Sequence, residues 1–277
     1  MSDKNVSIAI ISIATNKYFE YWKDMVTSCL KIKQNNINLS FHVITNEYKK
    51  FNLFKDGISN AKMIMHEIEN LEWPYATLLR YKLIMQIQNE LDSDIVMYID
   101  ADMKFHSAFE FNEVITPSLR DVVLIKHPGF WRPKFQMRVR MAVRQPTQPI
   151  KDLVRFIKLG GLGDWELKKK SMAYVPRKYR REYVCGGFWL GERESILNMC
   201  KDLSYRVDSD LSNNIIPVWH DESYLNYWSA QNKYVSFNPE FSYEPNYQNL
   251  TGLEMKIEAV DKGSNFLRNE TCLKDER

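Results

Sequence analysis

The chain has 277 residues, of which 44% are hydrophobic and 26% are charged, and its formal net charge is +3. This length is enough for one large domain or two small ones with a sizeable core. The composition is ordinary for a globular protein, and so small a net charge gives no reason to expect nucleic acid as the main partner. A local basic patch that meets an anionic ligand is still compatible with it.

The N-terminal residues read as neither a secretory leader nor a membrane anchor. The apolar run that follows Val6 is interrupted by polar residues and ends at Ile13, which is too short to span a bilayer. The four cysteines have no spacing typical of a metal site or a disulfide framework. We therefore expect a cytoplasmic protein.

Strand-like and helix-like segments alternate along the chain. Short β-branched runs predict strands at Val6–Ile13, Leu39–Thr45, Lys62–His66, Val96–Asp100 and Val122–Ile125. Apolar residues at helical spacing predict helices from Tyr18 to about Lys33 and across Trp73–Leu91. This alternation predicts an α/β fold with a mainly parallel sheet flanked by helices.

The segment 133–163 differs from the rest of the chain in charge. It carries seven basic residues, and Asp152 is its one acid. Charge runs are usually solvated faces, so a solvated surface insertion is one interpretation. A lid or a patch that faces an acceptor substrate is the other.

The stretch "VMYIDADMKF" ends a buried-looking strand with two aspartates, Asp100 and Asp102. Side chains two apart in a strand share a face, and two carboxylates so close repel unless a cation lies beside them. Mg²⁺ or Mn²⁺ suits such oxygen ligands and usually also holds substrate phosphates. The alternative is a strand-end turn in which the aspartates cap backbone groups.

The stretch "WHDE" sets Trp219, His220, Asp221 and Glu222 in a row directly before a helical pattern. Acidic residues are common caps at helix N-termini, which is the simpler interpretation of Asp221. The alternative is an aromatic ring that stacks on a carbohydrate beside a carboxylate. Glu222 would then act on the positive charge that develops at a sugar carbon during glycosyl transfer.

Two adjacent glycines, Gly186 and Gly187, interrupt the aromatic strand "YVCGGFWLG". They indicate either a ligand that approaches the backbone closely or a β-bulge.

Near the C-terminus, Lys262 and Arg268 can clamp a phosphate, although residues so close to a terminus are often disordered.

In this order, six stretches resemble glycosyltransferase family 6, which includes the ABO histo-blood-group transferases, the α-1,3-galactosyltransferase and soluble bacterial relatives. They are "DAD", "HPGF" (127–130), "WELKKKSMAYVP" (165–176), "YVCGGFWLG", "WHDES" and "AVDK…R", and the resemblance runs from about Ile8 to Asn269. It implies a GT-A fold: a single domain over 5–258 with nucleotide-sugar and acceptor halves and a basic insertion at about 133–163. A tail at 259–277 would close over the donor diphosphate.

The resemblance also implies an activity. Family members transfer Gal or GalNAc from a UDP-sugar to the 3-hydroxyl of a β-galactoside with retention of configuration, usually with Mn²⁺, and Mg²⁺ is the alternative ion. Some bacterial relatives replace both aspartates with asparagine and need no metal, whereas this chain keeps both acids, so we predict metal dependence. Gly187 leaves room for an acetamido group, which favours UDP-GalNAc over UDP-Gal.

Motif positions imply a set of site residues. The donor-binding residues are Ile13, Ala14, Tyr18, Arg80, Asp100, Asp102, Cys185, Gly186, Gly187, Asp221, Lys262 and Arg268. Asp100 and Asp102 are also the metal ligands. The acceptor-binding residues are His127, Asp164, Trp219, Glu222 and Glu244. Glu222 is in addition the catalytic residue, as a nucleophile or as an electrostatic stabiliser of an oxocarbenium-like state.

Three departures from the family bear on the acceptor and the location. The segment 133–163 adds about two dozen residues. Asp164 stands where relatives have a small hydroxyl residue, and Glu244 where they have Asp. Without an N-terminal anchor, the Golgi placement of the animal enzymes does not transfer to this chain.

We thus expect a UDP-sugar donor and a glycan acceptor as partners, with no nucleic acid and no membrane anchor, and leave the oligomeric state open. Two alternatives stand beside the transferase. One is a catalytically weak glycan-binding protein of the same fold. The other is a different metal-dependent nucleotide-sugar or phosphoryl-transfer enzyme, which would need a further acidic cluster.

Overall fold

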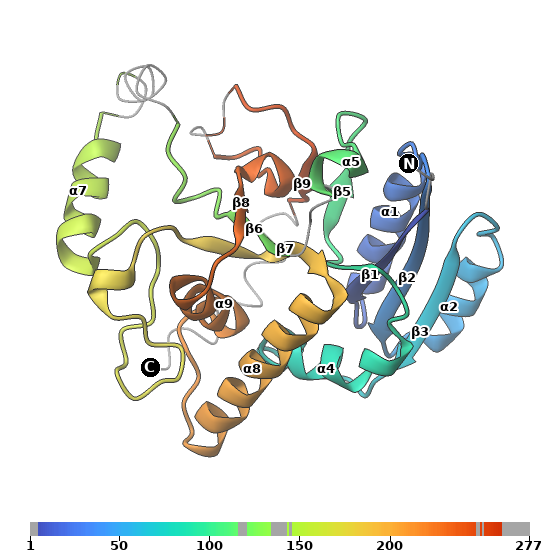
Figure 1. Ribbon diagram of the computed structural model, residues 1–277, viewed down its shortest axis with the longest axis horizontal. Coiled ribbons are helices and arrows are strands. Elements are labelled where there is room, and N and C mark those ends of the chain that lie inside the picture. The colour runs from blue at the N-terminus through green and yellow to red at the C-terminus, as the bar shows by residue number, and fades with distance from the viewer. Residues whose placement is uncertain are drawn as a thin grey trace.

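A seven-stranded mixed sheet with helices on both faces forms the body of the protein (Figure 1). This computed structural model describes residues 5–115, 121–133, 143, 146–247, 250 and 252–261. The strands are β1 (Val6–Ile13), β2 (Ile37–Thr45), β3 (Lys62–Glu67), β4 (Ile95–Ile99), β6 (Val122–Lys126), β7 (Val184–Glu192) and β8 (Val235–Phe237). Their order across the sheet is β3-β2-β1-β4-β7-β6-β8.

The sheet is mainly parallel, as predicted. The pairs β1–β2, β2–β3, β1–β4 and β6–β8 are parallel, and β7 runs antiparallel to both of its neighbours, β4 and β6. A separate antiparallel pair joins β5 (Met103–Phe105) to β9 (Ile257–Ala259). The five strands predicted from the sequence all form, with ends that differ by one or two residues.

Helices cover both faces of the sheet. They are α1 (Tyr18–Leu30), α2 (Tyr48–Lys55), α3 (Tyr75–Leu78), α4 (Arg80–Gln86), α5 (Phe111–Val114), α7 (Gln148–Leu159), α8 (Arg193–Ser212) and α9 (His220–Gln231). Short 3-10 turns lie at Gln88–Glu90, Arg177–Tyr179 and Pro239–Ser242. The helix predicted across Trp73–Leu91 is divided into α3, α4 and the first of these turns, because Leu79 leaves the helical region (φ −87°, ψ 6°).

The two larger of three hydrophobic core clusters in the described part of the chain lie one on each face of the sheet. One cluster packs α1 against the sheet through Phe19 and Trp22, and the other packs α4 and α9 through Tyr81 and Tyr224. All five residues of β4 are buried. Strands covered on both faces read as continuous apolar runs, which is why β4 was recognisable from its sequence.

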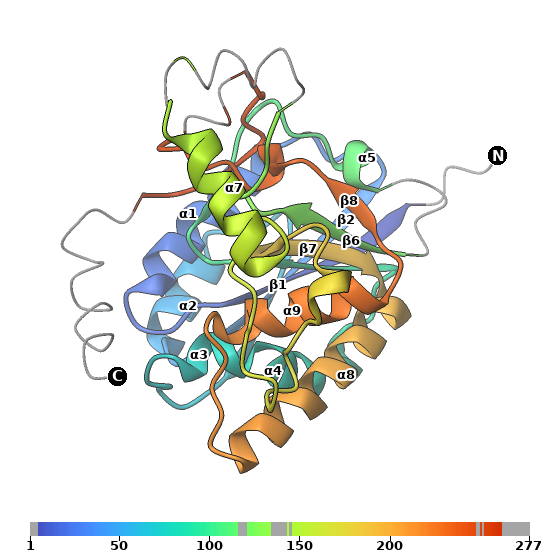
Figure 2. The ribbon, with the colours of Figure 1, turned by 90° about the vertical axis from the view of Figure 1, so that its left-hand side faces the viewer.

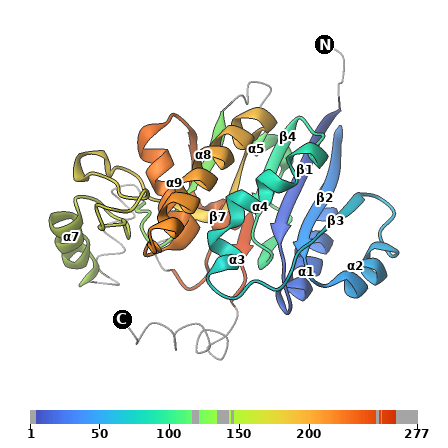
Figure 3. The same cartoon turned by 90° about the horizontal axis from the view of Figure 1, so that it is seen from below.

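The carboxyl ends of β1 and β4 meet α9 and the first half of β7, and this is where the site lies. The view from below shows α3, α4, α8 and α9 over one face of the sheet (Figure 3). Helix α7 projects at the end of the molecule opposite α2 (Figures 1 and 3). Among the residues that the structure describes, no helix has both the length and the apolar character to cross a bilayer.

Candidate active site

The two aspartates of "DAD" lie in a turn and not in a strand. Strand β4 ends at Ile99, and the turn is closed by a hydrogen bond that the amide of Met103 donates to the carbonyl of Asp100 (3.2 Å). Our prediction that Asp100 and Asp102 share one face of a strand is therefore wrong. The turn nevertheless brings Asp100 and Asp102 to one cavity of about 290 Å³, which Ile13 and Tyr18 also line.

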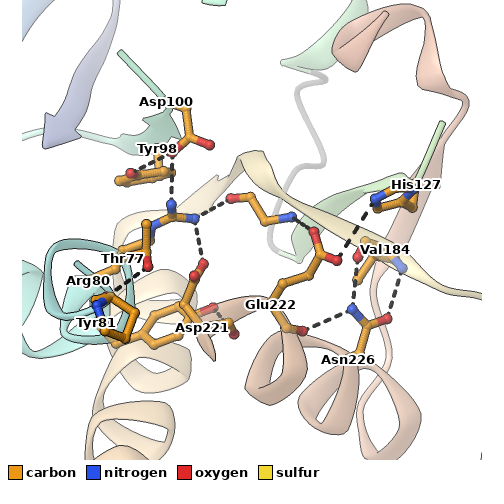
Figure 4. Close-up of polar contacts among 12 residues, drawn as sticks. Thr77, Arg80, Tyr81, Tyr98, Asp100, His127, Val184, Asp221, Glu222 and Asn226 are labelled. Carbon is orange, nitrogen blue, oxygen red and sulfur yellow. Dashed lines mark hydrogen bonds and ion pairs between the residues drawn. The ribbon is translucent and has the colours of Figure 1, made fainter. Parts of the chain in front are cut away.

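Arg80 lies at the centre of the site (Figure 4). Its Nη2 is 2.8 Å from Asp100 Oδ1, and its Nη1 is 2.7 Å from Asp221 Oδ2 and donates to the carbonyl of Gly186 (2.6 Å). The guanidinium carbon is 4.3 Å from the centroid of the Tyr98 ring, and the Tyr98 hydroxyl also donates to Asp100 Oδ1. Burial opposes the charge of Arg80, but Asp100 and Asp221 outweigh it and raise its pKa well above the ordinary value. Arg80 is thus a fixed cation that holds two carboxylates.

The two glycines of β7 let these carboxylates approach. A Cβ on Gly187 would lie 2.9 Å from Asp100 Oδ2, and a Cβ on Gly186 would lie 3.0 Å from Asp221 Oδ2. Real Cβ atoms essentially never show a contact below 3.0 Å, as at Gly187, and one of 3.0 Å, as at Gly186, requires the neighbour to give way by a few tenths of an ångström. The groups that approach the glycine pair in this structure are the protein's own carboxylates, and the approach of a ligand to this backbone stays a prediction.

The pairing of β6 with β7 is irregular beside these glycines. Leu124 pairs with Trp189, whereas Lys126 pairs with Val184, so the register shifts between the two pairs. The bulge interpretation of the sequence is therefore also supported. The irregular stretch of β7 is the part that faces the site.

The row "WHDE" lies at the N-terminus of α9, as the sequence predicted, and all four of its residues line a second, larger cavity. Trp219 occupies the N-cap position and has no side-chain cap bond, and His220 begins the helix with φ 43°. Asp221 does not act as a cap, because its carboxylate forms the ion pair with Arg80. Asp221 and Glu222 both lie in the first turn, where acidic residues interact favourably with the helix dipole.

Glu222 is held between the backbone of β7 and a histidine. Its Oε2 accepts a hydrogen bond from the amide of Gly186 (2.9 Å), and the Tyr183 hydroxyl is a second partner. Its Oε1 is 3.9 Å from His127 Nε2. Burial raises the pKa of Glu222 to about 7, and burial likewise raises that of Asp221 to about 7 against the opposing effect of Arg80. Perturbed carboxyl groups in a cavity are typical of catalytic sites.

His127 of "HPGF" is neutral and has a defined tautomer. Burial lowers its pKa to about 4, so the ring is uncharged at neutral pH. Its Nδ1 accepts a hydrogen bond from the amide of Gly129 (3.0 Å), which leaves the proton on Nε2. That proton is on the side of the ring nearest Glu222.

A second cavity, of about 740 Å³, adjoins the first. All five predicted acceptor residues line it, namely His127, Asp164, Trp219, Glu222 and Glu244. The two cavities share four lining residues, which are Trp73, Thr77, Arg80 and Asp100. The pair formed by Arg80 and Asp100 therefore lies where the cavities meet.

Some predicted donor residues do not line either cavity. Ala14 is fully buried and Cys185 is 5% exposed, and both belong to the core cluster on the α1 side of the sheet. Burial raises the pKa of the Cys185 thiol to about 12, so it is a packed thiol and not a reactive one. Lys262 and Arg268 lie outside the described residues.

Several residues of the site were not predicted from the sequence. Tyr98 lies under Arg80, Tyr183 contacts Glu222, and Trp73 lies where the cavities meet. Arg155, from the basic segment, also lines the second cavity. The sequence gave some signal for three of them, because Tyr98 adjoins "DAD", Tyr183 begins "YVCGGFWLG" and Arg155 lies in the basic segment; it gave none for their contacts, which join distant parts of the chain.

Comparison with known proteins agrees with this geometry. A seven-stranded mixed sheet flanked by helices, with two adjoining cavities at its strand ends, is the α/β arrangement of a GT-A-like glycosyltransferase. The model of the family described as Glycosyltransferase family 6 matches residues 163–269. This chain is a relative of that family, and its activity class is that of a glycosyltransferase.

Individual relatives match over most of the chain. The O-antigen biosynthesis glycosyltransferase WbnI of Escherichia coli is 23% identical over 244 residues, which cover 87% of this chain and 89% of that protein. The histo-blood group ABO system transferase 1 of Rattus norvegicus is 22% identical over 274 residues, covering 96% of this chain and 70% of that protein. The rat transferase 2 is 20% identical over 274 residues, with 96% and 72% covered.

Proposed function

We propose that this protein is a retaining α-1,3-glycosyltransferase that moves GalNAc, or Gal, from a UDP-sugar to a glycan acceptor of the β-galactoside type. The observation that carries the proposal is the junction of the two cavities. One cavity holds the aspartate pair, the other holds Glu222 and the acceptor residues, and Arg80 with Asp100 joins them. Transfer between two substrates needs two such compartments that meet at the reacting carbon.

The donor would bind in the smaller cavity. Ile13 and Tyr18 line its wall and would flank the uracil. Asp100 and Asp102 line the same cavity at the turn after β4, and the diphosphate would bind beside them. We propose that the tail residues Lys262 and Arg268 complete this site by closing over the diphosphate.

The aspartate pair fits a divalent ion of the Mn²⁺ or Mg²⁺ type. Carboxylate oxygens are the ligands that such hard ions prefer. Asp100 Oδ1 is already engaged by Arg80 and Tyr98, so Oδ2 and the Asp102 carboxylate would bind the ion. Within the described residues no three His, Cys, Asp or Glu side chains form a metal site, so the remaining ligands would be diphosphate oxygens and water. When bound, the ion would stabilise the negative charge of the departing UDP.

Glu222 would act on the sugar. Transfer breaks the bond between the anomeric carbon and the UDP oxygen, whose electron pair leaves with UDP, and forms a bond from that carbon to the acceptor 3-oxygen, whose proton would pass to the diphosphate of the departing UDP. The amide of Gly186 fixes one oxygen of Glu222, and the other lies in the larger cavity. In its ionised form this carboxylate would stabilise the positive charge of an oxocarbenium-like state, or bond to the carbon, on the face opposite the leaving group.

The preference for UDP-GalNAc rests on Gly187. We expect the missing side chain to leave room for an acetamido group, but the position that a Cβ would take is 2.9 Å from Asp100 Oδ2 and 3.1 Å from Met103 Cε, so the approach of Asp100 by itself also accounts for glycine here. The difference in transition-state binding between UDP-GalNAc and UDP-Gal that a small change in pocket size produces is about 1–3 kcal/mol.

The proposal is tested by UDP release without acceptor, since retaining transferases slowly hydrolyse their donors. UDP-GalNAc and UDP-Gal are each incubated with Mn²⁺ and with EDTA, for the unchanged chain and for Asp102→Asn. We expect release from UDP-GalNAc that needs Mn²⁺ and is lost in the variant. Release from UDP-Gal alone would reject the GalNAc preference but not the transferase.

The alternatives give different results in the same assay. A folded protein that binds UDP and releases none from either donor would contradict the transferase proposal and support the glycan-binding alternative. A phosphoryl-transfer enzyme would release a sugar phosphate in place of UDP. Product identification by mass spectrometry separates these outcomes.

A further inference from the structure

Helix α7 is seated on the protein by its polar side. The partly buried residues of this helix are Gln148, Asp152, Arg155 and Leu159, which follow one another at helical spacing and therefore form one face. Three of the four are polar. In an ordinary surface helix of a globular protein the inward stripe is apolar and the outward one is polar.

Two ion pairs hold this inward face. Arg132 donates through Nε and Nη2 to the two carboxylate oxygens of Asp152, each at 2.6 Å. Arg155 Nη2 is 2.9 Å from Asp164 Oδ1, and its guanidinium carbon is 4.8 Å from the centroid of the Phe130 ring. A bidentate pair of this kind fixes geometry as well as adding energy. The orientation of α7 is thus set by named contacts.

The outward face of α7 is apolar and exposed. Ile150, Leu153, Val154, Phe156 and Ile157 are 66%, 60%, 43%, 56% and 59% exposed. Figure 2, which looks onto this end of the molecule, shows α7 in front of the body of the protein. A contiguous apolar stripe of this size marks an interaction surface.

Charge indicates what covers this stripe. Lys151 and Lys158 are exposed and border it on one side, and the single acid of 133–163, Asp152, is neutralised on the inward face by Arg132. The outward side of α7 therefore combines apolar side chains with positive charge and no acid. This combination is typical of helices that lie in the interface of an anionic bilayer.

A second copy of the chain fits the stripe less well. In a symmetric dimer the same patch faces itself, so Lys151 and Lys158 of both copies would border one interface. Cores of protein interfaces are depleted of lysine, whereas a layer of anionic headgroups accepts it.

We propose that α7 docks this protein on the surface of an anionic lipid bilayer, with Leu153 and Ile157 in the headgroup boundary. Twelve helical residues measure about 18 Å, less than the ~30 Å hydrocarbon core, so α7 lies in the interface and does not cross it. Arg155 lines the larger cavity from the inward side of the same helix. That cavity then lies one helix diameter, ~10 Å, from the lipid. If the proposed transferase function holds, the docking would bring the acceptor-binding cavity close to the membrane surface.

Vesicle co-sedimentation of the full chain tests the docking. The vesicles are phosphatidylcholine alone, or phosphatidylcholine mixed with phosphatidylglycerol. We expect binding to the anionic vesicles only, weakened by added salt. The double variant Leu153→Glu/Ile157→Glu should lower the partition coefficient at least about tenfold, because it puts two charges into the boundary. The control Leu53→Glu changes an exposed leucine (79%) on α2 at the far end of the molecule and should bind as the unchanged chain does.

Three results would overturn the proposal: no binding to anionic vesicles, equal binding by the double variant, or a lipid-independent dimer that the double variant converts to a monomer. The last would assign the stripe to a second copy. UDP release by the same variants in lipid-free buffer tests the transferase proposal separately from the docking proposal. If the double variant loses vesicle binding but the donor turnover is unchanged, docking is separate from the chemistry. If no variant releases UDP but the unchanged chain binds anionic vesicles and the double variant does not, the transferase is rejected and the docking stands.

Discussion

Arg80 Nη1 lies 2.7 Å from Asp221 Oδ2, and this contact connects α4 to the first turn of α9. Both side chains are less than a tenth exposed. The same guanidinium reaches Asp100 at the end of β4, so three elements that are distant in sequence are held by one side chain. A buried cation between two carboxylates is stabilising only while all three groups are present, because any one left alone is a charge without a counter-ion.

Replacement of Arg80 by lysine should therefore cost both stability and activity. Lysine keeps the charge but cannot bridge Asp100 and Asp221 with a planar fork. We expect a loss of about 3 kcal/mol in the free energy of unfolding, measured by urea titration, and donor turnover lowered at least about a hundredfold. Arg206→Lys is the control, because Arg206 pairs with one carboxylate, Asp202, and stacks on the Tyr227 ring (4.1 Å), but does not bridge two buried acids; its loss of stability should be smaller than that of Arg80→Lys, and donor turnover should be unchanged. Equal effects in both variants would contradict the central role of Arg80.

Gly187→Ala should disturb the aspartate turn without removing a polar group. The new Cβ would lie 2.9 Å from Asp100 Oδ2 and 3.1 Å from Met103 Cε, so Asp100 must move. We expect stability to fall by about 1–3 kcal/mol and the Mn²⁺ concentration needed for half-maximal UDP release to rise. Gly57→Ala is the control, since its Cβ would make an ordinary contact at 3.5 Å. Normal Mn²⁺ dependence in Gly187→Ala would show that Asp100 is not a metal ligand.

Periodicity predicted most of the elements, because buried strands read as continuous apolar runs and the apolar residues of α1 recur at helical spacing in the sequence. The geometry of the aspartate pair could not be predicted in the same way. The strand spacing of Asp100 and Asp102 indicated a shared face, but the chain turns at Asp100 to reach β5, which pairs with β9 from the far end of the sequence. Local spacing carries no information about that pairing.

Helix α7 shows a second limit of sequence interpretation. The sequence left its basic segment open between a solvated surface and a patch that faces the acceptor, and the structure exposes Lys151 and Lys158 but places Arg155 at the larger cavity. An apolar stripe on a helix would ordinarily face inward. The pairs Arg132–Asp152 and Arg155–Asp164 reverse that orientation. Both depend on tertiary contacts between side chains that lie 20 and 9 positions apart in the sequence numbering.

Glu222→Gln should abolish turnover and leave the protein folded. The amide of Gly186 can still donate to the glutamine oxygen, so the local geometry survives, but the negative charge that stabilises the sugar cation is lost. We expect UDP release to fall at least about a hundredfold while UDP binding, followed by calorimetry, stays within about twofold. Glu67→Gln, on an exposed position of β3, is the control for loss of one carboxylate. Near-normal turnover in Glu222→Gln would reject its catalytic role.

The raised pKa of Glu222 has opposite effects on activity and stability. The ionised form is the active one, so UDP release at limiting donor should increase as the pH rises through about 7. The folded-state pKa lies above the unfolded value of 4.5. The stabilising contribution of the protonated group is therefore fully present below pH 4.5 and is lost as the pH rises from 4.5 through about 7. Glu222→Gln should therefore be more stable than the unchanged chain above about pH 7 and not below pH 4.5. Parallel pH–stability curves for the two proteins would contradict this.

Stability on the acidic side should depend on a buried histidine pair away from the site. His42 Nδ1 is 3.0 Å from His66 Nε2, and the rings stack between β2 and β3. Burial, His66 and Lys62 lower the pKa of His42 from 6.5 to about 4, so the unfolded chain binds more protons between those values. The free energy of unfolding should therefore decrease by about 2–3 kcal/mol as the pH falls through this range. His42→Gln should flatten this slope in urea titrations, whereas Ser40→Ala, which removes only the hydroxyl 3.3 Å from His42 Nε2, should keep it. An unchanged slope in His42→Gln would show that other groups govern the acid sensitivity.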